Sequence, residues 1–114
     1  MIYYKSKEQI ALMREGGKRL AEALQEVKKR VKPGISAADL DACAEEEIRK
    51  RGGKPIFKGF EGFPASLCVS INQEVVHGIP TKEKILTAGD IVGLDIGLEF
   101  QGWCTDMAGT VGVG

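Results

Sequence analysis

The sequence lacks a charge imbalance and a long apolar run, and it has only one histidine. Its 16 basic and 16 acidic residues give a formal net charge of zero, which argues against nucleic acid or an anionic membrane as the main partner. No apolar stretch approaches the length of a membrane-spanning helix, and the N-terminus lacks the apolar segment of a signal peptide. We therefore expect a cytoplasmic protein with no membrane partner.

Cysteine is also scarce, and the three cysteines are far apart in the chain. Cys43, Cys68 and Cys104 form no C-x-x-C pair, and an odd count does not suit a framework of disulfides. We interpret them as reduced, small apolar side chains rather than as metal ligands or nucleophiles.

The chain has 114 residues, enough for one small domain with one core, and its first half predicts two helices. Ser6 and Gln9 fit a capping box at the start of a long amphipathic helix that ends at Pro33-Gly34. Ser36 begins the second helix, and Gly52-Gly53 ends it with a left-handed cap. The apolar face of the first helix is predicted to hold Ile10, Met13, Leu20, Leu24, Val27 and Val31.

Charged residues on both helices are interpreted as solvent-exposed. Lys28, Lys29 and Arg30 suit the negative end of a helix dipole, although neighbouring cations could also contact nucleic acid. Residues 45–47 and 49–51 place acids and bases one turn apart, which is typical of a solvated helix face.

Residues 55–64 hold three of the four phenylalanines, separated by glycines. Such a segment can line an apolar pocket, or its rings can simply cover the core, and composition leaves both possibilities open. A strand is predicted at Leu67–Ile71, followed by a turn and by a return strand that begins at residues 74–76. His77 follows on a loop at the strand end, where a histidine is either a structural hydrogen-bonding group or a group in acid–base or substrate contact.

The last quarter of the chain predicts a hairpin of two alternating strands. If Gln101-Gly102 form the turn, apolar side chains pair on one face of the hairpin, and we expect this face to join the core. The predicted pairs are Phe100 with Trp103, Ile96 with Met107, and Val92 with Val111.

The opposite face of this hairpin carries Asp95 and Asp106 as diagonal neighbours, and Gly93, Gly97 and Ala108 leave space around them. Diagonal side chains in a sheet lie about 7–8 Å apart or closer. Two carboxylates at that separation can share a pair of metal ions about 3.5–4 Å apart. Aspartates on a solvated sheet face are also ordinary, so the spacing alone leaves both interpretations open.

Two helices followed by antiparallel strands predict an α+β fold. We expect the helices to pack on the sheet face that carries Ile96 and Met107, and the face with Asp95 and Asp106 to remain open.

Two stretches of the sequence resemble type I methionine aminopeptidases: PIFKGFEGFPASLCVSINQEVVHGIP and GDIVGLDIGLEFQGWCTDMAGTVGVG. The combination of N-x-E-x-x-H-G-I-P with D-x(10)-D is specific, and the similarity covers essentially the whole chain. The resemblance implies a pita-bread fold and an enzyme with two divalent metal ions (Mn, Co, Fe or Zn in the family). Such enzymes remove the initiator methionine from nascent chains.

By this resemblance, Asp95 and Asp106 match the first two metal-ligand aspartates, one of which bridges both ions. His77 matches the histidine that contacts the substrate near the scissile bond. Family members often have tyrosine where this chain has Phe60 and Phe63, so their hydroxyl groups are missing here. Low thiol reactivity is expected near the pocket, because His77 is its only plausible electropositive group. The positions that match the lining of the methionine side-chain pocket are Phe57, Phe60, Phe63 and Cys68.

The chain departs from this family in its length. The family's fold has two similar halves, and the second half supplies the remaining ligands, one histidine and two glutamates. Residues 1–114 are therefore expected to be a single domain equivalent to the N-terminal half of the catalytic domain.

Because the ligands of the second half are missing, we expect little or no activity from this chain alone. The substrates of a full enzyme would be peptides with an N-terminal methionine, and the expected protein partner is the complementary C-terminal half or a second copy in a homodimer. The alternative is a non-catalytic, homodimeric scaffold that binds divalent metal weakly.

Overall fold

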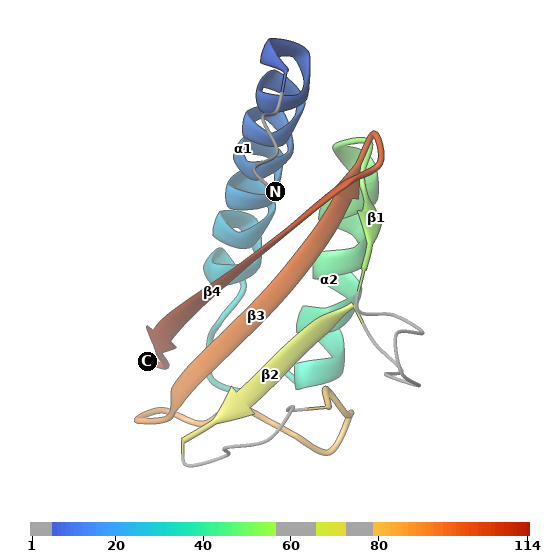
Figure 1. Ribbon diagram of the computed structural model, residues 1–114. Coiled ribbons are helices and arrows are strands. Elements are labelled where there is room, and N and C mark those ends of the chain that lie inside the picture. Colours follow the sequence, from blue (N-terminus) through green and yellow to red (C-terminus); the bar gives the residue numbers. More distant parts are fainter. Residues whose placement is uncertain (1–5, 57–65, 73–78) are drawn as a thin grey trace.

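A computed structural model describes residues 6–56, 66–72 and 79–114. In these ranges the chain forms two helices and four strands, and the helices lie in one layer behind the sheet (Figure 1). The predicted α+β architecture is confirmed. The elements are α1 (Lys7–Lys29), α2 (Ala37–Lys50), β1 (Lys54–Pro55), β2 (Leu67–Ile71), β3 (Ile91–Phe100) and β4 (Trp103–Gly112).

Both helices begin at the predicted capping boxes. The Ser6 hydroxyl accepts from the Gln9 amide at 3.1 Å, and the Gln9 side chain accepts from the Ser6 amide at 2.9 Å. Ser36 and Asp39 make the same reciprocal pair at the start of α2. After α2 the backbone of Gly52 has φ = +80°, which is the expected left-handed cap.

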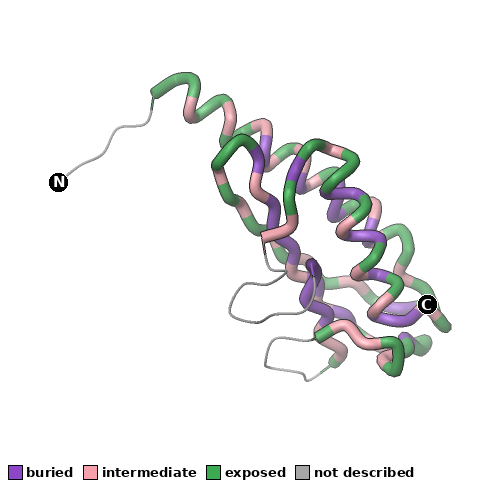
Figure 2. The backbone as a smooth tube through the Cα atoms, turned by 90° about the vertical axis from the view of Figure 1, so that its right-hand side faces the viewer, coloured by how far each residue is buried: buried purple, intermediate pink, exposed green. Residues whose placement is uncertain are grey.

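The first turns of α1 project beyond the sheet (Figures 1 and 2). Ile10 and Met13 are therefore 39% and 36% exposed, and their prediction as part of the buried face was wrong. The buried side of the helix begins only at Gly16, where an added Cβ would lie 3.4 Å from the Cβ of Phe100. A periodic pattern gives the direction of an apolar face but not the point at which its partner surface ends.

Strand β3 is the centre of the sheet and pairs antiparallel with β1, β2 and β4. The predicted hairpin register is confirmed, with Phe100 opposite Trp103 and Ile96 opposite Met107. Gln101 and Gly102 have φ values of 53° and 85°, as a two-residue turn between twisted strands requires.

The hydrophobic core fills the space between the helices and one face of β3. Alternate β3 residues from Val92 to Phe100 are buried there, and Met107 and Val111 of β4 pack against them in part. Helix α1 approaches β4 so closely that a Cβ on Gly109 would lie 2.7 Å from the Cε of Lys28. The helical layer therefore covers the predicted apolar face of the hairpin and leaves the other face open.

Part of the charge on α2 joins the two helices, which corrects the prediction of a solvated face. Glu47 is only 5% exposed and pairs with the guanidinium of Arg51. The Nε of Arg51 also lies 3.5 Å from a carboxylate oxygen of Glu22 on α1. In return, Arg19 of α1 donates to the carbonyl of Arg51 and stacks 4.2 Å from the ring centroid of Phe100. The acids and bases of α2 do lie one turn apart as predicted, but the contact with α1 determines that Glu47 is buried.

Candidate metal and substrate site

Asp95 and Asp106 lie on the open face of the β3–β4 hairpin. Asp95 pairs with Ala108, and Asp106 pairs with Gly97, so the two aspartates are diagonal neighbours as predicted. Asp106 is exposed, whereas Asp95 is half-buried and its Oδ1 atom is shielded from solvent. The site therefore combines a half-buried carboxylate, that of Asp95, with an exposed one, that of Asp106.

Cys68 of β2 lies directly opposite Asp95 on the same face. Its side chain is buried, and burial is the main cause that raises the pKa of the thiol above the ordinary value of 9.0. The negative charges of Asp95 and Asp41 raise that pKa further. The thiol is therefore neutral at pH 7, in agreement with the predicted low reactivity.

The other predicted substrate-contacting residues lie outside the described part of the chain. These are His77, Phe57, Phe60 and Phe63, together with the return strand predicted at residues 74–76. Their roles remain predictions.

The strand ends next to the site are fixed by a network around Asn72. Its backbone has φ = 56°, its side-chain oxygen accepts from the Ile91 amide at 2.9 Å, and its side-chain nitrogen donates to Asp90 at 3.1 Å. Asp90 also accepts from the amide and hydroxyl of Thr87 at 2.9 and 3.0 Å. The Thr87 amide, and then the Asn72 side chain, lower the pKa of the Asp90 carboxyl. This network ties the end of β2 to the start of β3.

At the other end of β2, α2 supplies a contact that the sequence analysis missed. Oδ1 of Asp41 accepts from the amides of Ser66 and Leu67 at 2.7 and 3.0 Å. The Ser66 hydroxyl donates to Glu45 at 3.0 Å. The only trace of this contact in the sequence is that Asp41 and Glu45 lie four residues apart and so share one helix face, and this spacing does not identify their partner.

The aspartate pair meets part of the requirement for divalent metal. Carboxylate oxygens suit hard cations such as Mg²⁺ and Mn²⁺, and both aspartates face the same open space. Within the described residues, however, no group of three His, Cys, Asp or Glu side chains is placed to hold a metal ion. The described residues therefore supply some of the ligands of a metal centre but not a complete set.

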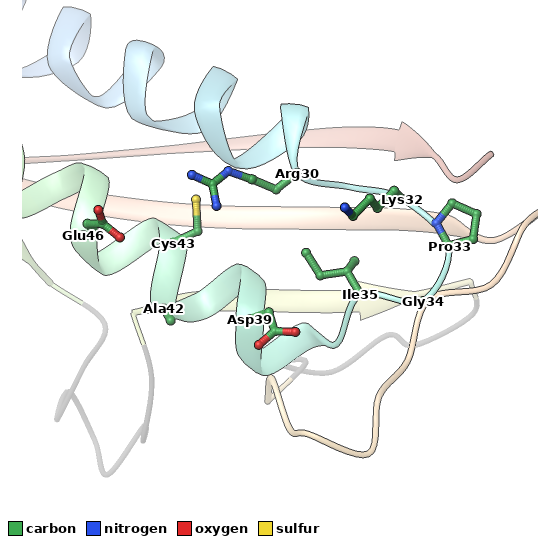
Figure 3. Close-up of a pocket in the computed structure, with 9 residues that line it drawn as sticks. All are labelled: Arg30, Lys32, Pro33, Gly34, Ile35, Asp39, Ala42, Cys43 and Glu46. Atoms are coloured by element: carbon green, nitrogen blue, oxygen red, sulfur yellow. The ribbon is translucent and has the colours of Figure 1, made fainter.

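A surface pocket of about 580 Å³ lies elsewhere, where the end of α1 and the following connection meet α2 (Figure 3). Its walls carry charges of both signs, including Arg30, Lys32, Asp39 and Glu46. None of the predicted site residues is among the residues that line it, so this pocket is separate from the aspartate site.

None of the described helices has the length and apolar character needed to cross a membrane.

Comparisons with known proteins agree on one family. The profile of metallopeptidase family M24 matches residues 11–114. The methionine aminopeptidases of Clostridium acetobutylicum and Bacillus subtilis are each 46% identical to the chain over 114 residues, which is all of this chain and 46% of each relative. A crystal structure of methionine aminopeptidase from Thermotoga maritima has a TM-score of 0.93 and 45% identity, over the whole chain and 46% of that protein. The chain thus spans about half the length of the curated relatives it matches.

Proposed function

Because the chain belongs to metallopeptidase family M24, we propose that it is one half of a metal-dependent methionine aminopeptidase. The resemblance to methionine aminopeptidases and the half pita-bread fold predicted from the sequence are both confirmed. The observation that carries the proposal is the pair of aspartates on the open face of the hairpin, in diagonal register. Residues 1–114 would then act as a single domain, equivalent to the N-terminal half of the catalytic domain.

In this proposal, Asp95 and Asp106 would hold divalent metal through their carboxylate oxygens. When bound, such a metal would supply Lewis-acid chemistry for peptide hydrolysis. His77 would contact the substrate near the scissile bond. A pocket for the methionine side chain would be lined by Phe57, Phe60, Phe63 and Cys68. The burial of Cys68 supports a role in an apolar wall rather than a role as a nucleophile.

Two aspartates offer too few ligands to hold two divalent ions well. The chain alone should therefore have little or no aminopeptidase activity. The missing ligands would come from the complementary half. We propose the cytoplasm as its location, which the free state of all three cysteines supports, since disulfides are rare there.

The proposal can be tested by complementation. The 114-residue protein would be mixed with a separately produced C-terminal half of the Bacillus subtilis relative, in the presence of Mn²⁺, and assayed on a Met-Ala peptide. We expect turnover only from the mixture and its loss in Asp106→Ala. Glu99→Ala is the matched control, because Glu99 is another acidic residue on the same open face of β3. Turnover by the 114-residue protein alone, or turnover by the mixture that survives Asp106→Ala, would contradict the proposal.

The alternative function is a non-catalytic homodimer that binds divalent metal weakly. It is favoured by the outer edge of β4, which has no strand partner among the described residues, and by the open face beside it. Exposed edges and open faces are surfaces that proteins usually cover. A second copy of the chain could cover them with two-fold symmetry.

A further inference from the structure

Ser66 is fully buried, although it is polar and lies outside the strands. Three hydrogen bonds from Ser66 and Leu67 to α2 explain this burial. Asp41 accepts both backbone amides, and Glu45 accepts the Ser66 hydroxyl. Because Asp41 and Glu45 sit on the same face of a well-capped helix, they offer acceptors at a fixed place for the chain as it enters β2.

The position of β2 along β3 determines which of its side chains reach the open face. In the observed register, Leu67 pairs with Ile96 on the core side, and Cys68 pairs with Asp95 on the open side. A slip of one residue would turn Cys68 toward the helices and Leu67 toward the open face. Among the described strands β2 pairs only with β3, and the contacts of Ser66 and Leu67 with α2 are a second constraint on its register.

We propose that Asp41 is a positioning residue for the aspartate site. By binding the amides of Ser66 and Leu67, it sets the register of β2 and places Cys68 beside Asp95. Glu45 assists through the Ser66 hydroxyl. The importance of this placement for substrate binding rests on the proposed function, but the placement itself does not.

The three cysteines provide the test, because they report on three different environments. Cys68 directly follows Ser66 and Leu67, the two residues whose amides Asp41 binds. Cys43 is buried in α2, and Cys104 is exposed on β4. The 114-residue protein would be treated with iodoacetamide under native conditions, and the labelling rate of each cysteine would be measured by peptide mass spectrometry. Cys43 serves as the monitor of global unfolding.

In Asp41→Ala we expect the labelling rate of Cys68 to rise about tenfold, because two amides lose a charged acceptor. The Cys43 rate should stay at its wild-type value. Asp41→Asn should restore most of the protection, since the amide oxygen can still accept from both backbone groups. Glu46→Ala is the matched control for Cys68, since it removes an exposed acid from α2 that does not bind Ser66 or Leu67, and it should leave the Cys68 rate unchanged.

Three results would overturn the proposal. They are an unchanged Cys68 rate in Asp41→Ala, a parallel rise of Cys43 and Cys68, which would show general destabilisation, and an equal rise in Asp41→Asn and Asp41→Ala. The last would show that the lost charge of Asp41, one cause of the raised pKa of Cys68, explains the rate. If Asp41→Ala does not fold, Asp41→Ser decides, because it replaces the charged acceptor of both amides by a shorter, neutral hydroxyl group. It should raise the Cys68 rate selectively, and a Cys68 rate equal to that of the unmodified protein would contradict the inference. Labelling needs neither metal nor substrate, so its outcome is independent of the complementation assay.

Discussion

Cys68 and Asp95 face each other across the β2–β3 pair, so a buried thiol lies beside a half-buried carboxylate. The carboxylate disfavours a second negative charge on its neighbour, in addition to the effect of burial. This pairing connects the outer strand of the sheet with the hairpin that carries both aspartates.

The first prediction concerns this thiol. Because its pKa lies above the ordinary value, Cys68 in the unmodified protein should react slowly at pH 7, and its labelling should accelerate only in alkaline solution. Exposed Cys104 should be labelled first. Rapid labelling confined to Cys68 at neutral pH would count against the neutral thiol.

Metal binding by the isolated chain should be weak. Calorimetric titration with Mn²⁺ should show no sub-micromolar site per monomer, because the described residues place no group of three His, Cys, Asp or Glu side chains where it could hold a metal ion. Any binding should vanish in Asp95→Ala/Asp106→Ala and persist in Glu99→Ala. An unchanged isotherm in the double variant would place the metal elsewhere.

The solution mass tests whether a second copy covers the open face. We expect a homodimer by light scattering, and it should tighten with Mn²⁺ and loosen with a chelator. Two-fold pairing would bring two copies of each aspartate together, and these charges repel unless cations bridge them. In Asp95→Ala/Asp106→Ala, association should lose its dependence on metal. A monomer mass at high micromolar concentration, unaffected by Mn²⁺, is the result that excludes the dimer.

Acid should weaken the link between the end of β2 and the start of β3. The folded-state pKa of Asp90 is lowered from 3.8, so its contribution to stability is complete above that value. It is lost as the pH falls through the folded-state pKa. Urea unfolding at pH 6 and pH 2.5 should therefore differ less in Asp90→Asn than in the unmodified protein. Thr87→Val, which keeps the backbone donor, should give a smaller reduction, and equal pH sensitivity in all three proteins would refute the network's role.

Two glycines should respond oppositely to alanine. An added Cβ on Gly17 meets no atom within 4 Å, so Gly17→Ala should stabilise α1 by about 1 kcal/mol through helix propensity. A Cβ on Gly53 would lie 2.5 Å from Cδ1 of Leu98, so Gly53→Ala should destabilise the protein by about 1–3 kcal/mol. Urea unfolding measures both changes, and effects of the same sign would contradict the packing at Gly53.

The hairpin could be predicted residue by residue because its determinants are local. Alternation defines two faces, and a two-residue turn at Gln101-Gly102 leaves one register that pairs apolar with apolar side chains. The same holds for the helix starts at Ser6 and Ser36, where the capping residues lie within one turn of each other.

The missed features depend on contacts between distant parts of the chain. Asp41 binds amides 25 and 26 residues away, and the burial of Glu47 depends on α1 lying next to α2. Likewise, the exposure of Ile10 follows from the length of the sheet relative to the helix. None of these relations leaves a periodic signal in the sequence.

The placement of both aspartates on one hairpin has a consequence for the order of folding. Local pairing around a two-residue turn forms in about 1–10 μs, whereas β2 must close a long loop before it can pair with β3. We therefore expect the carboxylate pair to assemble early, with Cys68 joining it in a later and slower step. The relative positions of the two carboxylates would then be determined by the hairpin alone, before the rest of the fold has formed.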